Sequence, residues 1–295
     1  RYFQNAYVER LVASGDVVGS NQKLEAVRDL LKAVRRASRS ARTALVVRRG
    51  PGLETAVLAF FSKTAVRARR GDAGIPAARR PLRVSFEGEA GVDEGGLTKE
   101  LFALFFDAAL GSNLFEDAGG AAVLPAPLPP DGAEAADARD RLEAFGRALV
   151  AALYEGAGAP ARLGPSLFKY LAHGDRHDAA ADGRALRDLA AFDPALGAIL
   201  ERMRTSESED WGLDFSDVGG DAATPVTDAN KRVFVRRKVG QVLVACRRGA
   251  LEALRNGFVE ALGDLSAEAA PFLKLFSSTD WRVLLCADDD RLAPG

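Results

Sequence analysis

The segment from Leu82 to Asp107, LRVSFEGEAGVDEGGLTKELFALFFD, constrains the fold more than any other part of this chain. Apolar and polar residues alternate from Leu82 to Glu87, which predicts a half-buried strand. A turn rich in glycine and acidic residues follows. After Gly96 the apolar residues are spaced as on one face of a helix. The predicted stripe consists of Leu97, Leu101, Leu104, Phe105 and Ala108, and is widened by Phe102 and Phe106.

A strand, a glycine-rich turn and a helix in this order can hold a phosphate group. The phosphate-binding loop of nucleotide-binding proteins needs a lysine directly after its last glycine. Here Leu97 follows Gly96, and the acidic side chains of Asp93 and Glu94 would repel an anion. The sequence therefore favours a tight acidic turn whose glycines dock the strand against the helix.

Composition and charge exclude several classes of protein. Hydrophobic residues make up 47% and charged residues 27% of the 295 positions, which is ordinary for a globular chain. The 40 basic and 41 acidic residues nearly cancel, so we expect neither a nucleic-acid nor a membrane partner. No apolar run approaches the roughly 20 residues that a membrane-spanning helix needs.

The cysteines and histidines indicate neither a disulfide framework nor a metal site. Cys246 and Cys286 are the only cysteines, which predicts a reducing compartment, the cytoplasm or the nucleus. His173 and His177 have the i, i+4 spacing of two zinc ligands on a helix. Because Gly174 and Asp175 between them indicate a loop, we expect solvated histidines, and we predict no metal and no cofactor.

The amino-terminal part should contain alternating helices and strands. We expect a helical lead-in over residues 1–43, with Asn21 as the cap of its basic helix. Thr43–Arg49 is predicted as a short strand, and Leu53–Thr64 as a helix. Residues 117–137 lack periodicity and are dense in Pro, Gly and Ala, which predicts a mobile surface loop.

The carboxy-terminal part should be mostly helical. Pro165 and the Asp193-Pro194 pair are suited to the first turns of two helices. Trp211–Phe215 alternates like a short strand, and Thr227 is the predicted cap of a long helix that reaches Cys246.

The stretch FEGEAGVDEGGLTKELFALFF resembles the signature of the HECT domain of ubiquitin-protein ligases, in which a strand, a G-E-x-G-x-D-x-G-G turn and a phenylalanine-rich helix follow one another. Five further segments resemble the family in the correct order, with Leu254 replacing an aromatic in the last: LEAFGRALVAALYEG, LGPSLFKYLAHG, LRDLAAFDPAL, VTDANKRVFV and LRNGFVEAL. The resemblance spans residues 44–290. It implies a mostly helical α+β amino-terminal lobe, with a large subdomain and a small one near residues 196–230.

What this resemblance implies is a transferase that passes ubiquitin from a conjugating enzyme to its own cysteine and then to a lysine. The cysteine belongs to a carboxy-terminal lobe and follows a threonine. Here no Thr-Cys pair occurs, and only the short link 291–295 follows the lobe, so we expect no catalytic residue. The implied partners are a ubiquitin-conjugating enzyme, ubiquitin and a protein substrate.

Neither cysteine is expected to serve as the nucleophile. Cys286 precedes an acidic run, which disfavours a thiolate. Cys246 lies beside Arg247 and Arg248, but its helical spacing from Val242 places it on an apolar stripe. We predict that both thiols are structural.

In the family, the small subdomain grips the conjugating enzyme through an apolar groove. The large apolar candidates for that contact are Leu200, Met203, Trp211, Leu213 and Phe215. Packing within the subdomain would explain each of them equally well. Trp211 is the strongest candidate, because aromatic side chains dominate interface anchors. Asp217–Thr224 is shorter than the family pattern, which leaves less chain to form the groove.

Two hypotheses from different classes follow. The chain is the amino-terminal lobe of a HECT-type ubiquitin ligase whose catalytic lobe lies beyond Gly295, or it is a non-catalytic binding module that keeps only the conjugating-enzyme dock. The coding sequence past Gly295 would separate them, since the ligase requires a further lobe with a Thr-Cys motif.

Overall fold

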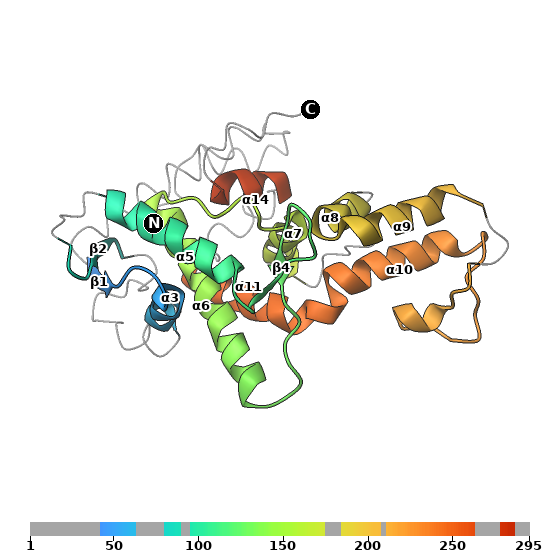
Figure 1. Ribbon diagram of the computed structural model, residues 1–295, viewed down its shortest axis with the longest axis horizontal. Coiled ribbons are helices and arrows are strands. Elements are labelled where there is room, and N and C mark those ends of the chain that lie inside the picture. Colours follow the sequence, from blue (N-terminus) through green and yellow to red (C-terminus); the bar gives the residue numbers. More distant parts are fainter. Residues whose placement is uncertain are drawn as a thin grey trace, which may run out of the picture.

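The chain forms an elongated, mostly helical α+β structure, seen here in a computed structural model (Figure 1). The structure describes residues 42–62, 80–89, 95–174, 184–207, 211–262 and 278–286. The helix predicted after Asn21 lies outside them, as does most of the predicted acidic turn. None of the helices in the described ranges is long and apolar enough to cross a bilayer.

The two predicted strands are present and pair with each other. β1 (Thr43–Val47) runs parallel to β2 (Leu82–Phe86), in a register that sets Thr43 opposite Leu82. Strand alternation buries the side chains of Leu45, Val84 and Phe86. Parallel strands need a crossover connection, and α3 (Leu53–Phe61) lies within it.

The helix α5 (Gly96–Leu110) follows Gly95, whose φ of 104° suits only glycine. Leu101 and Phe105 are fully buried, as predicted, together with Phe102 and Phe106. The predicted stripe is wrong at Leu104 and Ala108, which are exposed. The buried face of α5 includes Phe102 and Phe106 instead, because α5 packs against β2, α3 and α6 (Ala133–Glu155) on that side.

The segment 117–137 differs from the predicted loop at its centre, where a short strand forms, and at its end, where α6 begins at Ala133. β3 (Phe115–Glu116) pairs antiparallel with β4 (Leu124–Pro125), and Val123 and Leu124 are completely buried. The backbone N–H of Val123 donates to the carbonyl of Arg162 at 2.8 Å. Such short strands carry no measurable periodicity and pair with distant residues, so the local pattern could not reveal them.

Further helices complete the structure. They are α7 (Pro165–His173), α8 (Ala185–Phe192), α9 (Pro194–Thr205), the 3₁₀ helix η3 (Phe215–Val218), α10 (Lys231–Leu243), the 3₁₀ helix η4 (Ala245–Arg247), α11 (Arg248–Leu262) and α14 (Ser278–Leu285). Pro165 opens α7 as predicted. His173 ends α7, and His177 lies outside the described residues.

The centre of the fold is the contact between α6 and α11 (Figure 1). A Cβ atom added at Gly257 would lie 1.8 Å from the carbonyl oxygen of Glu143, and one at Gly146 would lie 2.1 Å from that of Leu254. The two backbones can therefore approach this closely only because both positions are glycine.

A buried arginine strengthens this contact. Arg147 of α6 forms ion pairs at 2.8 Å with Glu143 and with Glu260 of α11. Its guanidinium also donates to the carbonyl oxygen of Phe61, at the end of α3, at 3.2 Å. Because a buried charge is costly unless it is paired and hydrogen-bonded, Arg147 requires α3, α6 and α11 to be together.

Replacing Gly257 with alanine should destabilise the protein although alanine is the better helix former. The new methyl group meets backbone atoms, which cannot rotate away, so we expect a loss of about 1–3 kcal/mol in the free energy of unfolding. Urea titration measures it. The control is Gly96→Ala, where nothing lies within 4 Å and the stability should stay within about 0.5 kcal/mol. Equal stabilities of the two variants would contradict the close approach.

Candidate functional site

The helices α9 and α10 run side by side and extend from the rest of the molecule (Figure 1). Asp193 caps α9 as predicted, with its side chain accepting a hydrogen bond from the N–H of Leu196 at 2.8 Å. Thr227 does not cap α10 through its side chain. Instead, its backbone N–H donates to the side-chain oxygen of Asn230 at 2.8 Å, and its carbonyl accepts from the N–H of Lys231.

Three of the five predicted contact residues lie in the core. Leu200 and Met203 are buried on α9, and Phe215 is buried on η3. The ring of Phe215 packs edge-on against that of Phe234 of α10, with 5.6 Å between centroids. These side chains hold α9, η3 and α10 together. Of the five predicted residues, Trp211 and Leu213 remain accessible at the surface.

Trp211 and Leu213 do not lie on a regular strand. The predicted strand is reduced to a single antiparallel bridge between Asp214 and Pro225. Gly212, with a φ of 61°, turns the chain between the two apolar side chains. Leu213 is 40% exposed and Trp211 is partly buried, so each leaves apolar area accessible; Trp211 lies near the end of α9 and the start of α10.

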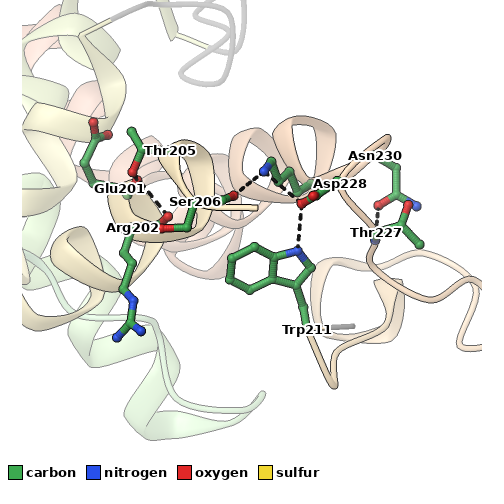
Figure 2. A network of polar contacts seen from close by, with 9 residues as sticks. Glu201, Arg202, Thr205, Ser206, Trp211, Thr227, Asp228 and Asn230 are labelled. Carbon is green, nitrogen blue, oxygen red and sulfur yellow. Dashed lines mark hydrogen bonds and ion pairs between the residues drawn. The ribbon is translucent and has the colours of Figure 1, made fainter. Parts of the chain in front are cut away.

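Polar contacts position the indole of Trp211 (Figure 2). Its Nε1 donates to Asp228 at 3.4 Å. The ammonium group of Lys231 donates to Asp228 at 2.8 Å and to the carbonyl of Ser206, and lies 5.7 Å from the centroid of the indole ring. Lys231 thus joins the end of α9, the start of α10 and Trp211. Lys231 was not among the residues predicted from the sequence, although the i, i+3 spacing of Asp228 and Lys231 is a signal for such a pair.

The prediction for Cys246 is wrong in its environment, because the side chain is exposed. The helix α10 ends at Leu243 and the chain turns into η4, so the helical spacing from Val242 does not extend to the thiol. The Sγ atom donates to the carbonyl oxygen of Val242 at 3.4 Å. Cys286 is buried, as expected of a structural thiol.

Within the described ranges, no group of three or more His, Cys, Asp or Glu side chains is arranged to hold a metal ion. The guanidinium of Arg247 is engaged by other acceptors, since it donates to Glu116 at 3.0 Å and to the carbonyls of Pro125 and Val242, both at 2.8 Å.

Replacing Lys231 with methionine should loosen Trp211. The carbonyl of Ser206 and the carboxylate of Asp228 lose a charged donor, so we expect the free energy of unfolding to fall by about 1–3 kcal/mol. Acrylamide should then quench more of the tryptophan fluorescence, since the other tryptophan, Trp281, is buried. The control is Lys238→Met on the same helix. Unchanged quenching in Lys231→Met would show that Lys231 does not position the indole.

Two comparisons with known proteins place the chain in a family. The sequence profile of the HECT-domain (ubiquitin-transferase) family matches residues 101–293. A Dictyostelium discoideum protein named bifunctional serine/threonine-protein kinase/NEDD4-like E3 ubiquitin-protein ligase is 31% identical over 147 residues, which is 49% of this chain and 7% of that protein. The profile covers more than half of the chain, so the chain belongs to the HECT-domain family of ubiquitin transferases.

Proposed function

We propose that this chain docks a ubiquitin-loaded conjugating enzyme for a HECT-type ubiquitin ligase. In this proposal, ubiquitin passes to a cysteine in another lobe of the complete ligase and then to a lysine of a protein substrate. Membership of the ubiquitin-transferase family supports the reaction class. Neither cysteine forms a disulfide, which favours a reducing compartment, and we assign the activity to the cytoplasm or nucleus.

The apolar surface of Trp211 and Leu213 is the observation that carries the proposal. Protein interfaces combine a small apolar centre with a polar rim, and aromatic anchors dominate their energetics. Leu213 is among the few exposed large hydrophobic residues in the described ranges. Asp228 and Asp214 supply polar groups beside it. A partner that covers this surface would bury apolar area without disturbing Leu200, Met203 or Phe215 in the core beneath.

The environments of the cysteines favour docking over chemistry on this chain. Transfer through a thioester needs a thiolate, which requires nearby positive charge or a base. The charge of Arg247 is engaged by Glu116 and backbone carbonyls. The thiol of Cys286 is buried. A non-catalytic binding module is the alternative, and it shares the docking step but not the transfer to a second cysteine.

Truncating the apolar surface should weaken docking. Trp211→Ala should lose about 2 kcal/mol of binding free energy, near thirtyfold in affinity. Leu213→Ala should lose about 1 kcal/mol, because its methyl groups are only partly covered. Calorimetric titration against a panel of ubiquitin-conjugating enzymes measures both.

The matched control for Leu213→Ala is Leu104→Ala on α5. Leu104 is similarly exposed, at 38%, and is distant in sequence from Trp211 and Leu213. It should bind like the unmodified protein. Melting temperatures of all variants separate lost contacts from lost folding. Binding that is equal in Trp211→Ala, Leu213→Ala and the unmodified protein would place the dock elsewhere.

This chain should not carry ubiquitin on its own cysteines. When it is incubated with ubiquitin, activating enzyme, conjugating enzyme and ATP, we expect no adduct that a thiol reductant removes. Non-reducing electrophoresis detects such an adduct. An adduct that vanishes in Cys246→Ala and persists in Cys286→Ala would instead identify Cys246, which is exposed, as a ubiquitin carrier.

A further inference from the structure

A cleft of about 610 Å³ lies between α8, α9 and α10. Its floor is apolar and includes Leu186, Val235 and Val239. Gly197 of α9 allows the close approach of α8 there, since a Cβ atom at this position would lie 2.7 Å from Ala190. Four arginines line the same cleft, and we call it the arginine cleft: Arg187, Arg204, Arg232 and Arg236.

The arginine cleft is strongly positive although the whole chain has a net charge of -1. Its one acidic lining residue among those described is Glu201, which forms an ion pair with Arg204 at 2.6 Å. The hydrogen bonds from Arg204 lower the pKa of Glu201, so this carboxylate stays ionised and offsets one arginine. For Arg187, Arg232 and Arg236 the described part of the chain supplies no carboxylate partner.

The start of α8 adds to this positive character. Ala185, Leu186 and Arg187 form its first turn and line the arginine cleft, and the N-cap residue, Arg184, makes no side-chain cap hydrogen bond. The first N–H groups of a helix have no acceptor within it, and the helix dipole is positive at this end. The arginines and the helix start therefore favour a negatively charged ligand in the same place.

The arrangement of the charges selects the kind of anion. The arginines come from three helices, and Arg232 and Arg236 are four residues apart on α10, which separates them by roughly 5–6 Å at Cβ. Charges spaced along an extended chain match arginines that come from three different helices. The apolar floor also offers burial to a side chain that a free phosphate lacks.

We propose that the arginine cleft binds an anionic peptide segment of a partner protein. Its carboxylates or phosphorylated side chains pair with Arg187, Arg232 and Arg236, and an intervening apolar side chain lies on Leu186, Val235 and Val239. Arginine clusters recognise acidic and phosphorylated motifs in this way, through bidentate hydrogen bonds. The proposal does not depend on the docking surface formed by Trp211 and Leu213.

The probe is a fluorescein-labelled peptide of about eight residues that alternates glutamate and leucine, a length suited to one groove. Two further peptides replace glutamate with glutamine or with phosphoserine. Fluorescence anisotropy with the whole chain should show binding of both anionic peptides, weakening as salt increases, and none of the glutamine peptide. Tenfold tighter binding of the phosphoserine peptide would assign the site to phosphorylated segments, and comparable binding to acidic ones.

The double variant Arg232→Gln, Arg236→Gln should bind the preferred anionic peptide at least tenfold more weakly. Its control is Arg202→Gln, Arg139→Gln, which removes the same charge from two exposed arginines outside the cleft and should bind normally. If melting shows that the first double variant is unfolded, Arg187→Gln alone should weaken binding about fivefold, close to one lost ion pair.

Three results would overturn the proposal. They are equal binding of the glutamine peptide, unchanged affinity in the folded cleft variants, and full displacement of the peptide by inorganic phosphate at a concentration equal to that of the peptide. The last result would identify a simple ion site.

Discussion

The close approach of α6 and α11 is the constraint on which the other contacts depend. With glycine at positions 146 and 257 the two backbones meet, and Arg147 then lies where Glu143, Glu260 and the carbonyl of Phe61 can pair it. A side chain at either glycine would separate the helices and take Glu260 away from the buried charge of Arg147, which would keep Glu143 of its own helix as its ionic partner. The rest of the core packs on this pair. Phe145 of α6 contacts Phe105 of α5, with centroids 5.8 Å apart, and Phe258 of α11 contacts Trp281 of α14 at 5.7 Å.

A second buried arginine connects the core around α6 and α11 to the helices that carry the candidate sites. Arg247 follows α10, and its guanidinium donates to Glu116 of β3, to the carbonyl of Pro125 of β4 and to that of Val242. It also lies over the ring of Phe192 of α8, 5.0 Å from the centroid. Because this charge is buried, its partners cannot separate cheaply. Arg247 thereby sets the position of α8 and α10 relative to the core around α6 and α11. The position of both candidate sites follows from this.

One helix contributes to both sites because consecutive helical residues point in different directions, about 100° apart. Lys231 points to Ser206 and Trp211, whereas the next residue, Arg232, lines the arginine cleft. Phe234 of the same helix packs against Phe215 in the core. The two proposed sites therefore use different faces of the same helix.

Local chemistry was sufficient to predict much of the fold. The strands β1 and β2, the helix α5 and the starts of α7 and α9 were all predicted, because alternation, helical spacing and caps such as Asp193 act within a few residues. The family resemblance was equally visible in the sequence, since its motifs are contiguous. The sequence did not show which of the five apolar candidates are exposed, because cores and interfaces use the same residue types. Only packing shows that Phe215 is enclosed while Leu213 is exposed.

Tertiary structure alone decided the features that depend on residues far apart in the chain. The pairing of β3 with β4, the exposure of Leu104 and the exposed thiol of Cys246 follow from where neighbouring elements lie and where α10 ends. The arginine cleft has the same origin. Its basic run near Arg232 and Arg236 is visible in the sequence, but such a run on one helix usually forms a solvated face. It becomes a candidate site here because folding brings Arg187 and the start of α8 beside it, across an apolar floor.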